Sequence, residues 1–278
     1  MFQGRKIVIA TMHKKEQVIA PILEKNLGVE VVVPKNFNSD KFGTFTREIK
    51  RVGDQLEAAR KKLLAAMDME EIDLGVSSEG SFDTDPSMPF IKSNLELVLL
   101  IDKRNNLEIK GFYRTPETNA DGAYVKNTDE AFEFARQIGF PNHGVIVRKK
   151  ENDKSKIYKN IHSEEELAAL VKKLFESPFT KKIFIETDMR AHRNPTRMKA
   201  IEKATENLVK NIFSVCPACQ APGFVVFDIE KGLPCATCGL PTELFKTEIY
   251  LCSKCGYKEK KQIATAEADP EYCSHCNP

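Results

Sequence analysis

The sequence lacks any apolar run that is long enough to cross a membrane. Its longest apolar segments have the length of a strand, such as residues 95–101, which include a glutamate. A membrane-spanning helix needs roughly 20 apolar residues in a row. The N-terminal residues run directly into a β-like segment, without the apolar stretch and small-residue cleavage site of a signal peptide. We therefore expect a cytoplasmic protein without a membrane partner.

The sequence also lacks a strong excess of charge of either sign. The net charge is +2, and the contents of 41% hydrophobic and 29% charged residues are typical of a globular chain. In residues 216–278, six lysines stand against eight acidic residues. A nucleic-acid-binding module needs an excess of Lys and Arg to displace counterions from phosphates. We therefore do not expect nucleic acid as a partner.

Several well-known catalytic motifs are missing as well. There is no Gly-x-x-x-x-Gly-Lys-Ser/Thr phosphate loop, no Gly-x-Gly-x-x-Gly turn and no Gly-x-Ser-x-Gly elbow. These absences argue against a P-loop nucleotidase, a Rossmann dinucleotide-binding enzyme and an α/β-hydrolase. No cysteine occurs before residue 216, so a cysteine nucleophile in the larger part of the chain is also excluded.

All eight cysteines occur in the last quarter of the chain, as four Cys-x-x-Cys pairs. These are Cys216 and Cys219, Cys235 and Cys238, Cys252 and Cys255, and Cys273 and Cys276. Strict pairing at this spacing indicates metal ligation in a reducing compartment rather than a disulfide framework. Two such pairs supply the four thiolates of a tetrahedral zinc site. The sequence therefore predicts two structural Zn²⁺ ions in residues 215–278.

The order in which the four pairs combine is less determined. The spacers between them have 15, 13 and 17 residues, and each fits a β-hairpin. Because short loops close at a lower entropic cost, we favour sequential pairing and two zinc ribbons in tandem. Combinations of the first pair with the third or the fourth stay open. A site with four cysteines leaves no open position on the metal, so we expect a module for stability, self-association or contact with a protein partner.

Residues 1–214 alternate between strand-like and helix-like segments. Strands are expected over residues 6–11, 29–33, 74–78, 95–101, 107–113, 144–148 and 183–185. Helices are expected up to residue 27 and over residues 55–67, 128–138, 164–175 and 195–213. Ser163 with Glu166 forms a capping box, and Asn194 with Pro195 marks another helix start. This alternation predicts one three-layer α/β/α domain with a mixed central sheet, in residues 1–214.

Polar clusters follow two of the expected strands, where ligands bind in open α/β sheets. Thr11, His13 and Lys15 come after the first strand and offer a hydroxyl, an imidazole and an ammonium group to a phosphate. Glu79 follows a later strand at an expected tight turn, where its carboxylate suits Mg²⁺. Glu48, before Gly53, could supply a second carboxylate. A polar loop, a turn and a solvated helix face remain the alternatives.

A third polar cluster precedes the helix that starts at Pro195. It contains Asp188, Arg190, His192, Arg193 and Arg197. The N-terminus of a helix carries a partial positive charge, which disfavours arginine side chains beside it and attracts anions. Arg side chains also bind phosphate through two parallel hydrogen bonds. We therefore expect this cluster to bind an anion or a nucleotide.

The whole chain resembles a bacterial family of unknown function. The resemblance rests on Ala-Thr-Met-His-Lys-Lys-Glu at residues 10–16, Ser-Glu-Gly-Ser-Phe at residues 78–82, and the motif that starts with Glu-Thr-Asp-Met-Arg at residues 186–198. The four cysteine pairs complete it. This family implies no established activity.

Residues 5–200 are more distantly similar to the inosine/xanthosine triphosphate pyrophosphatases. Thr11 matches the first position of their Thr-x-Asn-x-x-Lys motif, where His13 replaces Asn and Glu16 replaces Lys. Segments 48–59, 78–80 and 191–193 echo their acidic helix, acidic turn and base contact. The resemblance implies a Mg²⁺-dependent nucleotide hydrolase with Glu48 and Glu79 at the metal. The alternative is a non-catalytic adaptor that binds a nucleotide or another phosphorylated small molecule.

Overall fold

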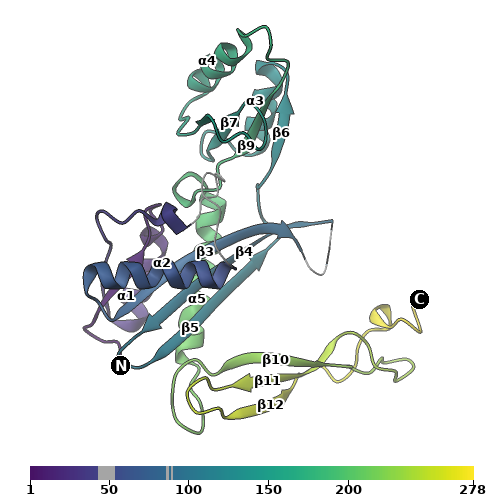
Figure 1. The fold of residues 1–278 in the computed structure, drawn as a ribbon. Coiled ribbons are helices and arrows are strands. Elements are labelled where there is room, and N and C mark those ends of the chain that lie inside the picture. The colour runs from purple at the N-terminus through teal and green to yellow at the C-terminus, as the bar shows by residue number, and fades with distance from the viewer. Residues whose placement is uncertain (43–53, 86–87, 89) are drawn as a thin grey trace. The chain divides into compact units, whose positions relative to one another are not determined.

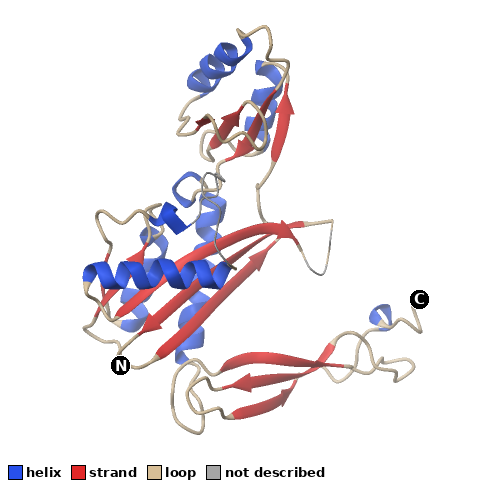
Figure 2. Ribbon diagram, in the orientation of Figure 1, coloured by secondary structure: helices blue, strands red, loops and turns tan. Residues whose placement is uncertain are grey.

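The computed structural model of the chain describes residues 1–42, 54–85, 88 and 90–278. The chain divides into two compact units, Met1–Val209 and Lys210–Pro278. The first is a mixed α/β unit and the second carries the cysteine pairs, which confirms the predicted fold class (Figures 1 and 2). Among the described residues, no helix has both the length and the apolar character that a membrane span requires.

A five-stranded mixed sheet forms the centre of the first unit. Its strands are β1 (Lys6–Ala10), β2 (Glu30–Val32), β3 (Leu74–Thr84), β4 (Lys92–Asp102) and β5 (Leu107–Thr115), in the order β2-β1-β3-β4-β5. Strand β1 pairs in parallel with both β2 and β3. Strand β4 is antiparallel to β3 and to β5. Strand β2 therefore lies on one side of β1, and β3, the next strand along the chain, lies on the other side.

Helices cover both faces of this sheet. On one face lies α2 (Gln55–Glu70; Figure 1). Its residues Ala59 and Leu63 share a core with Val8 and Leu97 of the sheet. On the other face α5 (Pro195–Phe213) approaches β5 closely, because Gly111 has no side chain to hold it away. Helix α1 (Glu16–Leu27) connects the parallel strands β1 and β2. A right-handed crossover places α1 on the face opposite α2, so the predicted three layers are present.

The strands after β5 form a second sheet rather than extending the first. Its strands are β6 (Gly122–Val125), β7 (Val145–Arg148), β8 (Ile157–Tyr158) and β9 (Ile183–Thr187), in the antiparallel order β6-β9-β7-β8. Helices α3 (Thr128–Gln137) and α4 (Glu164–Phe175) cover one face and build a separate core with it. The side chain of Ser163 caps α4 as predicted. Short 3-10 turns occur at Ser39–Phe42, Ala191–Arg193 and Pro270–Tyr272.

The second unit is built on a three-stranded antiparallel sheet. It contains β10 (Val225–Lys231), β11 (Phe245–Leu251) and β12 (Lys258–Gln262) in sequence order. Val225 lies opposite Leu251 at one end of the β10–β11 pair, and Lys231 lies opposite Phe245 at the other end. Each spacer between cysteine pairs therefore carries one long strand instead of the hairpin that we expected. Successive cysteine pairs consequently alternate between the two ends of the sheet.

Candidate metal centres and candidate ligand site

The eight cysteines gather in two groups of four. One group contains Cys216, Cys219, Cys252 and Cys255, and the other contains Cys235, Cys238, Cys273 and Cys276; within each group all sulfur atoms lie within 4.8 Å of one another. Between the two cysteine pairs of each group, Sγ–Sγ distances are 3.8 and 3.6 Å in the first group and 3.9 and 3.6 Å in the second. A tetrahedron with Zn–S bonds of about 2.3 Å has edges of about 3.8 Å. The two groups can each hold one metal ion, and their geometry and donors fit zinc.

Four similar turns hold the sulfur atoms in place. In each pair, the residue after the second cysteine donates its backbone N–H to the carbonyl oxygen of the first, at 2.8 to 2.9 Å. Gly239 and Gly256 adopt a left-handed backbone, with φ of 70° and 75°. Gln220 adopts the same conformation with φ of 58°. The first cysteine of each pair is buried and the second is exposed, so each centre has one protected side.

The structure combines the first pair with the third and the second with the fourth, so the favoured sequential pairing is wrong. The cause is that each spacer contains a single strand, which carries the chain from one end of the sheet to the other. Strand β10 carries the chain from the first pair to the far end of the sheet, and β11 returns it beside the first pair. Strand β12 then leads away again to the fourth pair. The prediction of sequential pairing took account only of the lengths of the spacers. Because each spacer forms an extended strand, the cysteine pairs at its two ends lie at opposite ends of the sheet and cannot share a metal ion.

The thiols of one group cannot all ionise without a cation. Burial raises the pKa of Cys252, but backbone N–H groups of Cys255 and Lys254 outweigh it and bring that pKa to about 7. A backbone N–H of Tyr257 favours the thiolate of Cys255, but the sulfur of Cys219 and the other sulfurs raise its pKa to about 12. Removal of the remaining thiol protons at neutral pH requires a bound divalent cation.

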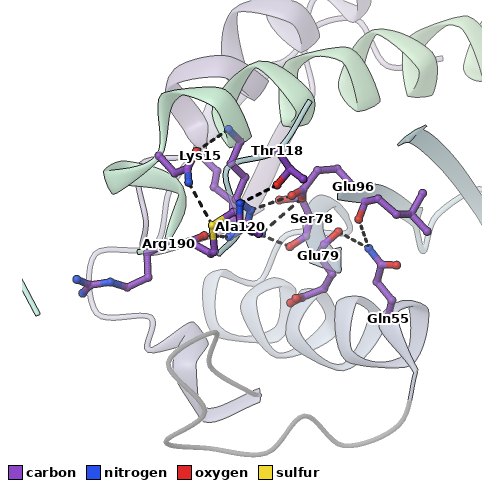
Figure 3. A network of polar contacts seen from close by, with 12 residues as sticks. Lys15, Gln55, Ser78, Glu79, Glu96, Thr118, Ala120 and Arg190 are labelled. Atoms are coloured by element: carbon purple, nitrogen blue, oxygen red, sulfur yellow. Dashed lines mark hydrogen bonds and ion pairs between the residues drawn. The ribbon is translucent and has the colours of Figure 1, made fainter. Parts of the chain in front are cut away.

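The first two predicted polar clusters meet at the carboxyl end of β1. Lys15 lies just before α1, and its Nζ donates to the carbonyl oxygen of Ser78 at 2.9 Å (Figure 3). The pairing of β1 with β3 ends at Ala10 and Ser77, so Ser78 lies one residue beyond the paired segment. Lys15 is only 5% exposed. Burial, reinforced by the charges of Lys62 and Arg197, lowers the pKa of Lys15 well below its usual range.

Glu79 lies inside a strand and not at a turn. Strand β3 continues to Thr84, and Glu79 pairs there with Leu97 of β4. Its carboxylate forms an ion pair with Lys62 of α2, and Lys62 also donates to Ser78 O at 2.7 Å. Gln55 Nε2 donates to the carbonyl oxygen of Glu79 at 2.6 Å. The side chain of Glu79 is 13% exposed, which leaves it accessible from one side.

Arg197 approaches the same region from the first turn of α5. Its Nε donates to Glu96 Oε1 at 2.8 Å, and its Nη1 donates to Met189 O at 2.6 Å. Arg197 and Glu96 have side-chain exposures of 1% and 0%. The backbone N–H of Arg197 donates to the Asn194 side chain, so the predicted cap of α5 is present. We call Lys15, Lys62, Glu79, Glu96 and Arg197 the charged cluster.

Two predicted imidazoles also lie together. The rings of His13 and His192 stack with centroids 5.1 Å apart and planes inclined by 18°. Burial, followed by the charges of His13 and Arg190, lowers the pKa of His192 to about 4. Thr11 accepts a hydrogen bond from the backbone N–H of His13 at 3.2 Å and so shapes this loop. His192 is therefore neutral at physiological pH, which suits a hydrogen-bonding role rather than an electrostatic one.

The three arginines of the third cluster do not converge on one point. Arg190 forms an ion pair with Asp188 at 2.6 Å and donates to Asn160 at 2.8 Å. Its side chain extends away from Lys15 and Ser78 in Figure 3. Arg193 donates to Ile161 O at 2.5 Å. Of the three, only Arg197 belongs to the charged cluster.

The charged cluster contains two residues that were not predicted from the sequence, Lys62 and Glu96. One predicted residue, Glu48, does not enter the described site. Glu48 and Gly53 lie outside the described residues. Lys62 belongs to the apolar stripe of α2, between Ala59 and Ala66, where a lysine is unusual enough to be a signal. Glu96 likewise interrupts the apolar run of β4.

Comparison with known families identifies the chain only at the level of a family. A family model described as "Domain of unknown function (DUF6671)" matches residues 62–278. The chain belongs to this family. The DUF6671 match starts at Lys62 and contains all eight cysteines, whereas β1 and the loop with Lys15 precede it. No curated protein matches the chain, so the resemblance of this DUF6671 protein to the pyrophosphatases stays a prediction.

Proposed function

We propose that this protein binds two structural zinc ions and that its first unit binds the phosphate groups of a nucleotide or a similar small molecule. The ligand site lies at the carboxyl ends of β1 and β3. The supporting observation is the contact between Lys15 Nζ and Ser78 O, 2.9 Å. In the strand order 2-1-3 the parallel neighbours β2 and β3 lie on opposite sides of β1, and open α/β sheets bind ligands at the carboxyl ends of the strands at such a point.

The charges of the site favour an anionic ligand. Lys15, Lys62 and Arg197 bring three cations, whereas Glu79 and Glu96 bring two carboxylates. Lys15 is buried and its pKa is low, so its ammonium form needs another negative charge. A phosphate would supply that charge. Ser78 Oγ is also buried and has no hydrogen-bond partner among the described residues, so it can donate to the same ligand.

Hydrolysis of the ligand is the catalytic form of this proposal. Glu79 is a partly accessible carboxylate beside Lys15, and Mg²⁺ binds through one or two carboxylates together with phosphate oxygens. A metal held there would activate a water molecule for attack on phosphorus. Binding without turnover is the adaptor form. The two forms differ in whether Glu79→Gln abolishes phosphate release while the ligand still binds.

Calorimetric titration with inorganic triphosphate and with nucleoside triphosphates tests the site. We expect Lys15→Met to weaken binding at least tenfold, because it removes the buried ammonium group. Lys25→Met is the matched control, because Lys25 is an exposed lysine in the last turn of α1, the helix that follows Lys15. Equal affinities of the wild type and the Lys15→Met variant, or no binding of either ligand, would contradict the proposal. Release of phosphate with Mg²⁺ by the wild type alone would support the hydrolase form.

We also propose that the zinc module contacts a protein partner or a second copy of the chain. Strand β10 forms one edge of its sheet and carries exposed apolar side chains, of which Phe227 is 65% exposed. Edge strands with such side chains are prone to pair with other chains. Sedimentation of the wild type and of Phe227→Ser tests self-association. A wild type that is monomeric at all concentrations leaves only a different protein as the partner.

A further inference from the structure

One end of the second sheet is flanked by lysines from all four of its strands. Strands β6 and β7 end there, and β8 and β9 begin there, as their antiparallel register requires (Figure 1). The two residues that adjoin each of these strand ends include no acid and six exposed lysines: Lys126, Lys149, Lys150, Lys156, Lys181 and Lys182. At the opposite end, the corresponding positions contain Asp121, Asp188 and a single lysine, Lys159. We call the surface formed by the six lysines the basic end.

Acidic side chains reduce the charge of the basic end only in part. The adjoining loops and helix ends contain five acids: Asp129, Glu130, Glu151, Asp153 and Glu176. The same segments add three exposed lysines: Lys154, Lys172 and Lys173. Two of the acids accept hydrogen bonds from nearby backbone N–H groups, Asp153 from Ser155 and Glu130 from Lys126. An excess of positive charge remains, and it attracts an anionic partner.

An exposed apolar side chain lies next to these lysines. Phe179 belongs to a turn that is closed by a hydrogen bond of 3.0 Å from Thr180 N to Ser177 O. The side chain is 92% exposed. A single exposed apolar residue is common on a protein surface. Phe179 differs in its place, because Lys181 and Lys182 follow it directly and the combination of a bulky apolar side chain with lysines is typical of interfacial anchors.

The aromatic rings and the cations of the basic end favour a lipid surface over nucleic acid. Lys182 Nζ lies 4.1 Å from the centre of the Tyr124 ring, and Lys156 Nζ lies 5.1 Å from that of Tyr158. Lysines therefore occupy ring faces on which bases would stack. Arg148, which ends β7, is buried in an ion pair with Glu186. Nucleic-acid sites rely on stacking faces and on arginine, whereas exposed lysines around an apolar residue suit anionic headgroups.

We propose that the basic end of the second sheet binds an anionic lipid surface, with Phe179 inserted among the headgroups and the lysines beside the lipid phosphates. This contact needs no membrane-spanning helix. It replaces the expectation of no membrane partner, which rested on the absence of a spanning segment and of a signal peptide. One apolar side chain with a basic patch gives reversible binding. Because salt screens exposed charges, the binding weakens as the ionic strength rises.

Co-sedimentation of the full chain with lipid vesicles tests the proposal. We expect binding at low ionic strength to phosphatidylcholine vesicles that contain phosphatidylglycerol, and no binding to phosphatidylcholine alone. Lys149→Gln with Lys150→Gln should weaken this binding at least tenfold, because each lysine near an anionic surface contributes roughly fivefold. Phe179→Ser should weaken it at least about threefold, because insertion removes part of the ring from water.

Matched controls remove the same groups elsewhere on the chain. Lys25→Gln with Lys199→Gln removes two exposed lysines, and Phe90→Ser removes a fully exposed phenylalanine. Both controls should bind vesicles as the wild type does, and all variants should keep its thermal midpoint, because every replaced side chain is exposed. Equal binding to the two kinds of vesicle, no binding to either, or an unchanged affinity of the variant without Lys149 and Lys150 would overturn the proposal. Tighter binding of a single-stranded oligonucleotide with the same lysine dependence would assign the surface to nucleic acid and would also overturn it.

Discussion

Cys219 and Cys252 are 33 residues apart in the chain, yet their Sγ atoms lie 3.6 Å apart. This contact joins the first cysteine pair to the third, and the second pair is joined to the fourth in the same way. The two metal centres are therefore interleaved along the chain. The loss of either metal would release two segments that are far apart in sequence, so both centres restrain the sheet between them.

Double substitutions distinguish the interleaved arrangement from a sequential one. We expect Cys216→Ser with Cys252→Ser to remove a single centre and leave one zinc per chain, because both residues belong to the same group. Cys216→Ser with Cys235→Ser should remove both centres. Elemental analysis of protein purified under reducing conditions measures the zinc content. Sequential pairing requires the reverse result, and zinc contents in that order would refute the structure of the module.

Local signals in the sequence predicted the elements of the fold well. The glycine after Leu27 ends α1 in the left-handed conformation with φ of 63°, and Ser163 and Asn194 cap α4 and α5. These features act within a few residues, so periodicity and capping rules detect them. The partition of the strands into two sheets was not predictable in this way. It depends on whether the segment after β5 pairs with the neighbouring first sheet or with β9, which is far away in sequence.

The candidate ligand site was predicted only in part for the same reason. Lys15 and Glu79 follow recognisable strands, and the structure brings their surroundings together through Ser78 and Lys62. The arginine cluster was misleading, because three arginines in eight residues suggested one anion site. Their directions depend on distant partners such as Asn160 and Glu96, which sequence spacing does not reveal.

The ion pair between Arg197 and Glu96 predicts a large effect on stability. Glu96→Gln removes the charge that compensates a guanidinium with 1% exposure. Removal of one partner of a buried pair destabilises a protein by roughly 3–5 kcal/mol. Urea unfolding measures the change in the free energy of unfolding. Glu206→Gln is the control, because its pair with Lys203 is about half exposed and should contribute far less to stability. Similar effects of both variants would contradict a buried role for Glu96.

The stacked histidines predict a loss of stability in mild acid. The pKa of His192 is about 4 in the folded protein, below its ordinary value of 6.5. Between these values the unfolded chain binds the proton more readily, so stability falls as the pH drops from about 6.5 to 4. His13, Arg190 and Arg193 disfavour the charged ring, and Asp188 favours it.

Replacement of His192 by phenylalanine keeps a stacked ring and removes the titration. We expect the stability of the wild type to fall by about 1 kcal/mol more than that of His192→Phe between pH 7 and pH 4.5, a value discounted because the ring is only partly buried. Denaturant unfolding at both pH values measures this difference. Parallel changes in the two proteins would show that His192 is not the titrating group.

The close packing of α5 on β5 predicts that Gly111 tolerates no side chain. A Cβ atom at this position would lie 2.4 Å from both Ala204 O and Leu208 N, which are backbone atoms of the helix and cannot rotate away. Gly111→Ala should therefore push α5 off the sheet and destabilise the protein by roughly 1–3 kcal/mol. Gly80→Ala is a useful comparison, because the atoms nearest to its Cβ are side-chain atoms of Glu96 and Arg197. That substitution should disturb the charged cluster and weaken triphosphate binding, whereas Gly111→Ala should lower the thermal midpoint and leave the affinity of the remaining folded protein unchanged.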